Sequence, residues 1–420
     1  MNSLTIIFLI ALVLSVLIQF WLTQRHMRHV SAHRRQVPLD FTDRLSLEEH
    51  QKAADYTLAK ARFGNVELLY SAVLLLLWTL GGGLEWLDGL WRSLHTGTLT
   101  TGVGFMISAF LLMSLLDIPF SLYSTFVVEQ RFGFNKMTMS LYVADLQKGA
   151  LLTLAIGLPL GYVVLWLMEY SGSLWWLYVW LVWVGFTTFM MWAYPAWIAP
   201  LFNKFSPLAN QALEQRIDAL LTRCGFSNNG IFVMDGSRRS GHGNAYFTGF
   251  GSNKRIVFFD TLIETLSGEE VEAVLAHELG HFKHRHVIKR MITMALLSLL
   301  ALALLGWLMQ HDWFFNGLGI SQPSTHAALL LFMLVMPVFS VYIQPLSSFI
   351  MRKHEFEADD YASQQSSAAD LIKALVKLYK ENSNTLTPDP LYSAFHDSHP
   401  PAPIRIAFLS SKLKQQEVTP

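Results

Sequence analysis

Two histidines and a glutamate in residues 271–282 have the types and spacing of a catalytic metal site. They form the motif H-E-x-x-H, which runs from His277 to His281. On a helix, residues four apart lie on one face, so the two histidines can hold a single Zn²⁺ ion. Glu278 projects beside them and can accept a proton from the attacking water. The motif therefore predicts metal-assisted hydrolysis with Glu278 as the general base.

The residues around the motif predict the helix that the motif needs. Ser267 followed three residues later by Glu270 is a capping box, which marks a helix N-terminus. Apolar residues then recur at helical spacing and supply a face that can be buried. These residues are Val271, Val274, Leu275 and Leu279.

A catalytic zinc also needs a third protein ligand and one open position. Glu355 and Asp359 are four residues apart and would share one helix face. We expect Glu355 to bind the zinc and Asp359 to accept the N–H of a liganding histidine, which would fix the tautomer of that histidine. Glu357 points away from Asp359 and is a poor substitute. The alternative interpretation of this segment is an acidic, solvated helix face.

Two further residues are candidates for stabilising the oxyanion, which needs an additional hydrogen-bond donor. They are His399, in the segment Ser398-His-Pro-Pro401, and Arg405. The alternative to a catalytic role for these two residues is a structural turn and a contact with a phosphate or carboxylate near the membrane.

Residues 244–250 are predicted to form an edge strand, paired through a hairpin turn at 251–254 with a strand at 255–259. A peptidase can bind its substrate as an added strand on such an edge. Asn244, Ala245 and Tyr246 are therefore the expected substrate-binding residues, although the hairpin can also serve simply to support the zinc helix. His242, His284 and His286 are interpreted as polar contacts at the rim and not as ligands.

The composition is that of a membrane protein. The chain has 420 residues, of which 52% are hydrophobic and 15% charged, and its mean hydropathy is +0.34. Soluble domains average about 25% charged residues. The net charge is zero, so no basic surface indicates nucleic acid. The single cysteine, Cys224, excludes an intramolecular disulfide and any multi-cysteine metal site.

Seven segments are apolar and long enough to cross a bilayer. They are residues 4–22, 66–87, 102–127, 149–168, 174–198, 291–309 and 327–350. The last is expected to continue as one helix to residue 363. The loops at 24–64 and 129–148 are rich in Lys and Arg, whereas the other short loops contain only Arg92. The positive-inside rule then places the N-terminus outside and the zinc segment in the cytosol.

The expected fold is an all-α membrane protein with a small α+β metalloprotease domain on its cytosolic side. Residues 1–200 would carry spans one to five with the cytosolic loops 24–64 and 129–148. Residues 201–288 would form the catalytic segment, with a further strand at 231–234. Residues 289–350 would carry spans six and seven, and residues 351–420 would form a cytosolic tail with the third zinc ligand.

The chain resembles the type I CAAX prenyl endopeptidases, which are integral-membrane zinc proteases of the gluzincin type. The resemblance spans nearly the whole chain. Its motifs are KAADY (52–56), RFGFNK (131–136), PLFNK (200–204), DGS (235–237), HGNAYF (242–247), KRIV (254–257), FDTL (259–262), HELGH (277–281), EFEAD (355–359) and HPP (399–401).

The resemblance implies a barrel of seven helices around a large water-filled chamber, capped by the zinc site. It implies zinc bound by His277, His281 and Glu355, with Glu278 as the general base. The family usually has a carboxylate just before the Arg that follows His-Pro-Pro; here that position is Ile404, which makes the role of Arg405 less secure.

Family substrates are prenylated proteins ending in Cys-a-a-X, from which the last three residues are removed. A bacterial homologue would instead act in quality control without prenyl specificity. The short loops favour a bacterial inner membrane, with the endoplasmic reticulum membrane as the alternative. A second hypothesis, from a different class, is a non-catalytic membrane scaffold or conduit with a structural zinc. The motif favours the enzyme, because Glu278 has no task in a structural site.

Overall fold

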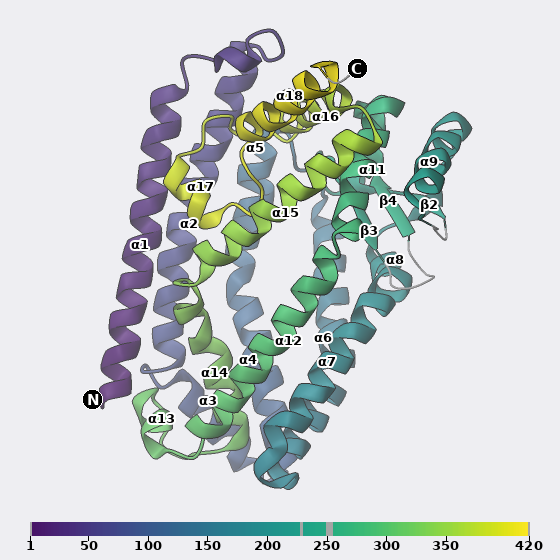
Figure 1. Ribbon diagram of the computed structural model, residues 1–420. Coiled ribbons are helices and arrows are strands. Elements are labelled where there is room, and N and C mark those ends of the chain that lie inside the picture. The colour runs from purple at the N-terminus through teal and green to yellow at the C-terminus, as the bar shows by residue number, and fades with distance from the viewer. Residues whose placement is uncertain (1, 227–229, 249–254, 419–420) are drawn as a thin grey trace.

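The computed structural model describes residues 2–226, 230–248 and 255–418. The helices that span the membrane stand side by side, and the sheet and the last helices lie together at one end of them (Figure 1). The N-terminus lies at the opposite end of the first helix. The predicted turn at 251–254 and the end of the predicted strand at 249–250 lie outside the described residues.

Within the part of the chain that the structure describes, six helical segments are long and apolar enough to cross a membrane, and a bent pair of helices makes a seventh span. The spans are Ser3–His33 (α1), Leu47–Trp78 (α2), Thr98–Phe132, Met139–Tyr170 (α6), Gly172–Phe202, His286–Leu308 (α12), and the pair Thr325–Ser340 (α14) and Gln344–Gln365 (α15). Thr98–Phe132 contains α4 (Thr98–Tyr123), η2 (Ser124–Glu129) and α5 (Gln130–Phe132), and Gly172–Phe202 contains α7 (Trp175–Ala193), η4 (Tyr194–Ile198) and α8 (Ala199–Phe202).

The seven spans, which we call the barrel, bury little of their apolar surface within the protein. In each of the six unbroken spans, at most 28% of the most apolar 18-residue stretch is buried. The other apolar side chains are available to contact lipid. The predicted class, a seven-span helical membrane protein with a small α+β unit, is confirmed, and the chamber stays an expectation.

The seventh span is not the single helix that the sequence predicted. α14 ends at Ser340, α15 begins at Gln344, and the two axes differ by 69°. Pro345 lies in the first turn of α15 and has no N–H to donate to the preceding turn. The proline therefore breaks the helix, and α15 carries Glu355 across the end of the barrel instead of along its wall (Figure 1).

The second span also ends earlier than predicted. α2 stops at Trp78, and the glycines at 81–83 follow it; Gly82 has a left-handed φ of 80°. A new helix, α3 (Gly83–Ser93), then starts. The prediction that one span continues to residue 87 was wrong, because consecutive glycines remove the conformational bias that sustains a helix.

The extramembrane unit contains a four-stranded sheet in the order β1-β2-β4-β3. Its strands are Phe205–Pro207 (β1), Ile231–Met234 (β2), Ala245–Thr248 (β3) and Arg255–Phe259 (β4). β2 and β4 are parallel, and the other two pairs are antiparallel. β3 therefore lies at an edge, as predicted, whereas β1 was not anticipated.

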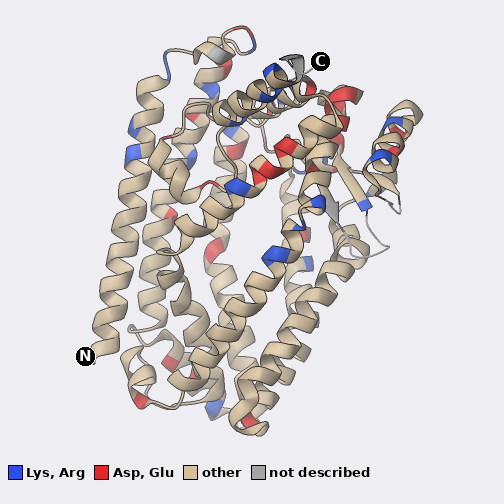
Figure 2. Cartoon of the chain, in the orientation of Figure 1, with Lys and Arg blue, Asp and Glu red and all other residues tan. Residues whose placement is uncertain are grey.

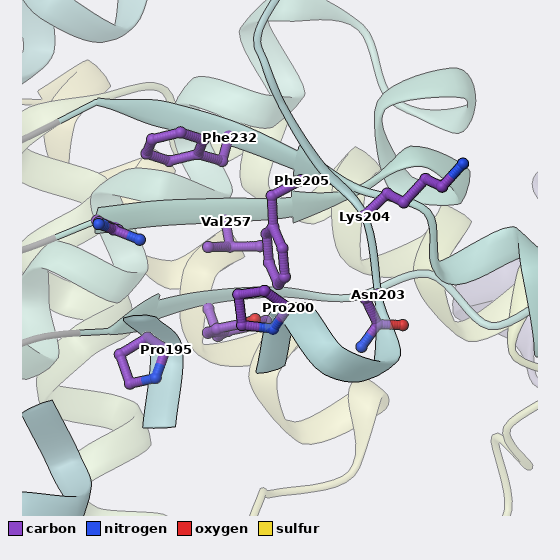
Figure 3. Close-up of a pocket in the computed structure, with 9 residues that line it drawn as sticks. Pro195, Pro200, Asn203, Lys204, Phe205, Phe232 and Val257 are labelled. Carbon is purple, nitrogen blue, oxygen red and sulfur yellow. The ribbon is translucent and has the colours of Figure 1, made fainter. Parts of the chain in front are cut away.

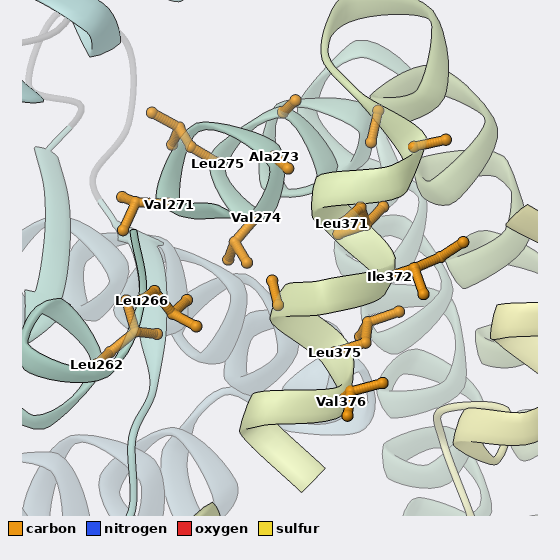
Figure 4. Close-up of a cluster of buried hydrophobic side chains, with 14 of the residues drawn as sticks. Leu262, Leu266, Val271, Ala273, Val274, Leu275, Leu371, Ile372, Leu375 and Val376 are labelled. Atoms are coloured by element: carbon orange, nitrogen blue, oxygen red, sulfur yellow. The ribbon is translucent and has the colours of Figure 1, made fainter. Parts of the chain in front are cut away.

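The helix that carries the H-E-x-x-H motif is α11 (Gly268–Lys283), and most of its residues between Glu270 and Gly280 are buried. Ser267 and Glu270 form the predicted capping box. Its apolar residues contact α10 (Asp260–Thr265) on one side and α16 (Ala368–Glu381) on the other (Figure 4). The same core includes α9 (Gln211–Cys224) and α18 (Ala402–Val418). This packing holds α11 rigidly above the spans.

The remaining short helices connect or anchor the larger ones. α13 (Asp312–Gly317) lies at the end of the barrel opposite the sheet, and α17 (Pro390–His396) packs on α1. Asp389 caps α17, and Arg25 of α1 donates to the Asp389 carboxylate at 2.9 Å. Lys and Arg gather towards the end of the molecule that carries the sheet (Figure 2).

Candidate metal centre

Three candidate ligands from two helices converge at one point. α11 supplies His277 and His281, and α15 supplies Glu355. The Nε2 atoms of the two histidines are 3.3 Å apart, and the Glu355 carboxylate oxygens lie 3.4 Å from His277 Nε2 and 3.3 Å from His281 Nε2. This is the group of residues that the sequence singled out. Among the described residues, no other group of His, Cys, Asp and Glu has the geometry to hold a metal ion.

The three residues fit a tetrahedral zinc ion. Bonds of 2.0–2.1 Å at tetrahedral angles place neighbouring ligand atoms about 3.4 Å apart. The distance between the two histidine nitrogens matches this spacing, and each nitrogen lies at a similar distance from one of the two Glu355 oxygens, Oε2 for His277 and Oε1 for His281. The Oε2 atom of Glu355 is also buried without a hydrogen-bond partner among the described residues. The Arg405 guanidinium lies 3.6 Å from this oxygen, and a metal ion would supply the direct bond that the buried oxygen lacks.

Asp359 and Arg405 hold His277 in place. The Asp359 carboxylate lies 2.8 Å from His277 Nδ1 and accepts two hydrogen bonds from the Arg405 guanidinium, at 2.6 and 2.9 Å. Asp359 is fully buried, and the Arg405 guanidinium balances its charge. With Nδ1 held by Asp359, the Nε2 atom of His277 is directed at the metal position.

His281 is oriented by residues that the sequence analysis treated as rim contacts or set aside. Its Nδ1 atom is 2.9 Å from His286 Nδ1, and His286 Nε2 is 2.9 Å from the Glu357 carboxylate. His286 is 5% exposed and stacks on the His354 ring. The interpretation of His286 as a rim contact is therefore corrected. The only feature of the sequence that could have indicated this role is the position of His286, a few residues after the helix that carries His277 and His281.

The chain reaches this position through a break between two helices. α11 ends at Lys283, and Arg285 adopts a left-handed φ of 56° before α12 begins at His286. The motif helix therefore does not run directly into the sixth span. The break turns His286 back towards His281, which an uninterrupted helix would place on a different face.

A cavity of about 310 Å³ opens beside the three candidate ligands. Glu278 lines it, as do Asn244 and Ala245 from the start of the edge strand, and His399. The Nε2 atom of His399 is 3.4 Å from Glu355. Among the described residues, none donates a hydrogen bond to the Glu278 carboxylate, which leaves its oxygens available.

Tyr246 lies on the other face of the sheet. Its side chain lines a separate cavity of about 400 Å³ with Phe232 and Val257 from the neighbouring strands. Pro195 and Pro200 from the end of the fifth span face these residues across the cavity (Figure 3). Because successive side chains of a strand point to opposite faces, Ala245 and Tyr246 cannot both face the metal. The Tyr246 side chain is therefore not part of the candidate centre.

A hydrogen-bonded chain joins the second span to the edge strand, and the sequence analysis did not detect it. The Tyr56 hydroxyl donates to Glu129 at 2.6 Å, and His242 Nε2 lies 3.4 Å from the same carboxylate. His242 Nδ1 is 3.2 Å from the Asn382 side-chain oxygen, which also accepts the Gly243 N–H. These contacts fix the start of the strand next to the cavity.

Known families match both halves of the chain. The family model described as "CAAX prenyl protease N-terminal, five membrane helices" matches residues 26–204, and the model described as "Peptidase family M48" matches residues 207–413. The boundary between the matches follows the fifth span, so the second match contains the extramembrane unit together with the sixth and seventh spans.

Several curated proteins are similar over nearly their whole length. CAAX prenyl protease 1 homolog from Oryza sativa is 36% identical, and the alignment covers 89% of this chain and 90% of that protein. CAAX prenyl protease 1 from Saccharomyces cerevisiae is 34% identical, with 93% and 91% covered. The fold is similar to the crystal structure of S. mikatae Ste24p, with a TM-score of 0.89, 31% identity, and 97% and 99% of the two chains covered.

Proposed function

The chain belongs to the M48 metallopeptidases as a homologue of CAAX prenyl protease 1 and is an integral membrane protein, and from this membership we propose that it hydrolyses peptide bonds near the C-termini of membrane-associated, prenylated proteins. The observation that carries the proposal is the convergence of His277, His281 and Glu355 beside a cavity lined by Glu278, whose carboxylate has no hydrogen bond to a described residue.

The residues of this chain divide the chemistry between them. His277, His281 and Glu355 would hold the zinc, which when bound supplies Lewis-acid polarisation of the scissile carbonyl and of water. Glu278 accepts the proton of the attacking water and delivers it to the leaving amine. Its carboxylate suits this role because it lines the cavity and is not engaged in a hydrogen bond with a described residue.

Of the two oxyanion candidates, His399 is better placed. It lines the cavity and is exposed, so its ring can donate to a substrate oxygen. Arg405 is 6% exposed and is bonded to Asp359. We therefore assign Arg405 a positioning role: it holds Asp359, which in turn holds His277.

The edge strand supports a substrate bound in extended form. Among the described residues, no strand pairs with the outer edge of β3, and Asn244 and Ala245 at its start line the same cavity as Glu278. A peptide added to this edge would be held by main-chain hydrogen bonds whatever its side chains. Asn244 and Ala245 keep their proposed substrate-binding role. Tyr246 could contribute through its main chain only.

The proposed orientation places the metal centre in the cytosol, where Lys and Arg gather (Figure 2). The relatives compared above are eukaryotic and lend no support to the bacterial inner membrane favoured by the short loops. The endoplasmic reticulum membrane therefore becomes the proposed location, and a prenylated substrate the proposed substrate class.

The central test is the Glu278→Gln variant of the full-length protein, assayed on a farnesylated Cys-a-a-X peptide. Loss of the general base should lower kcat by about 10²–10⁴-fold, while the zinc content stays at one ion per chain. Removal of zinc by a chelator should abolish activity, and added zinc should restore it. Unchanged activity in Glu278→Gln would contradict the mechanism and support a structural zinc instead.

The substrate class is tested separately with the unprenylated twin of the same peptide. A prenyl protease should cleave the farnesylated form with the higher kcat/KM. Equal values would retain the peptidase but remove the prenyl specificity, as the quality-control alternative requires.

A further inference from the structure

A second cavity lies next to the candidate metal centre and has the chemistry of a carboxylate site. It measures about 420 Å³ and is formed by α1, α2 and the segment from Ser383 to His396. We call it the Lys60 cavity. Its polar lining includes Lys60, His26, His396, Asn65, Gln19 and Thr23.

The charge of the cavity is positive. Lys60 supplies an ammonium group, and no Asp or Glu lies among the described residues that line it. The Lys60 ammonium lies over the Tyr56 ring, 5.0 Å from its centre, and forms no ion pair with a described residue. Glu129 is close enough to interact with Lys60 electrostatically, but its carboxylate accepts the Tyr56 hydroxyl. Lys60 therefore has no carboxylate within ion-pair distance among the described residues, and its ammonium group can bind an anion in the cavity.

Two imidazole rings add hydrogen-bond donors. His26 is 4% exposed, its ring stacks on Tyr392, and its Nδ1 accepts the Asp389 N–H, so that its Nε2 carries the proton. The Nε2 atom of His396 is buried without a partner among the described residues. Buried donors of this kind normally have partners, so an acceptor supplied by a ligand would satisfy them.

The Lys60 cavity adjoins the cavity of the metal centre. Asn384 lines both. Asn382, two residues earlier, is bonded to Gly243 at the start of the edge strand. A peptide added antiparallel to β3 would run with its C-terminal end towards Gly243 and hence towards Asn384. Three extended residues reach about 10 Å, which suits a carboxylate three residues beyond the cleaved bond.

We propose that the Lys60 cavity binds the free C-terminal carboxylate of the peptide substrate. The inference rests on the proposed peptidase function, because it concerns the other end of the same substrate. Lys60 would pair with the carboxylate, and the fixed imidazoles would donate to its oxygens. The cavity would thereby set the cleavage position by measuring from the end of the chain.

Binding to a catalytically silent protein tests this without relying on hydrolysis. The probe is a fluorescently labelled, farnesylated peptide with either a free acid or an amide at its C-terminus, and the full-length protein carries Glu278→Gln. The acid should bind about tenfold more tightly than the amide, as expected for one charge-assisted contact. Adding Lys60→Met should bring the two affinities within about twofold of each other.

Two further variants act as controls. Lys60→Arg keeps the charge and should keep the preference for the acid. Lys52→Met should also keep it, because Lys52 is on the same helix and likewise lies over a ring, that of Phe134 at 5.3 Å, but does not line the cavity. Zinc content measured on every variant checks that the protein is folded.

Equal binding of acid and amide would overturn the inference, as would a preference that survives Lys60→Met. If acid and amide bind equally while inorganic phosphate stabilises the protein in a Lys60-dependent way, the cavity binds phosphate and not a peptide terminus. Loss of hydrolysis in Glu278→Gln together with equal binding would leave the peptidase function intact and remove only this inference.

Discussion

At the scale of single residues, the two histidine ligands are held by different devices. His277 contacts a carboxylate directly, and Arg405 fixes that carboxylate. His281 reaches its carboxylate through a second histidine, His286. Both arrangements fix the imidazole ring so that Nε2 faces the metal position. Contacts of this kind, outside the ligands themselves, also affect the affinity for the metal.

The role of His286 predicts a loss of zinc affinity. His286→Ala should weaken zinc binding by about 10–100-fold, because His281 loses the partner that orients its ring. Competition with a chromogenic chelator measures this affinity on the full-length protein and does not depend on turnover. His286→Gln, whose amide can still contact His281, should recover part of the affinity.

His284→Ala is the matched control for this prediction. His284 also stacks on His286, with ring centres 5.6 Å apart, but no contact joins it to His281. Its zinc affinity should stay close to that of the wild type. Equal affinities for His286→Ala and wild type would show that His286 only packs against the site.

At the scale of elements, the metal site depends on how closely α11 and α15 approach. A Cβ atom at Gly280 would lie 2.8 Å from Ala358 Cα and 3.0 Å from its carbonyl oxygen. The absence of a side chain at Gly280 therefore allows the two backbones to come together. This approach brings Glu355 to within 3.4 Å of both histidines.

Gly280→Ala should force the two helices apart. We expect a cost of about 1–3 kcal/mol for overpacking this contact, seen as a lower Tm in detergent. Zinc affinity should fall as well, because Glu355 moves with α15. Gly149→Ala is the control, since a Cβ there meets nothing within 4 Å and alanine favours the helix. A wild-type Tm and zinc affinity in Gly280→Ala would show that the helices can separate without disturbing the site.

At the scale of the whole molecule, the barrel and the extramembrane unit meet through contacts between distant parts of the chain. α1 binds the C-terminal segment through Arg25 and Asp389. α2 reaches the edge strand through Tyr56, Glu129 and His242. These contacts place the metal centre at the end of the barrel where Lys and Arg gather (Figure 2).

The proposed orientation predicts which ends of the molecule face the cytosol. In a Cys224→Ser background, Ala212→Cys on α9 should react with a membrane-impermeant maleimide in intact microsomes, because its segment follows the positive-inside rule. Thr96→Cys, exposed between α3 and α4 at the other end, should react only after detergent is added. The opposite pattern would reverse the proposed topology.

Local patterns in the sequence were sufficient to predict the metal-binding motif, the capping box and the apolar spans. Helical periodicity alone puts His277 and His281 on one face of their helix, and it puts Glu355 and Asp359 on one face of a different helix. Hydropathy located the spans, because a bilayer selects for apolar length. It missed the break before Pro345 and the glycines at 81–83, which act through the backbone and not through hydropathy.

Only the tertiary structure decided which residues complete the site. The left-handed Arg285 turns His286 back to His281. The position of β3 in the sheet decides which of its two faces points to the metal, and this is the face of Ala245 and not of Tyr246. The Lys60 cavity joins residues more than 300 positions apart in the chain, such as His26 and His396. Periodicity relates residues within one element, whereas these contacts depend on how separate elements pack, which no local pattern records.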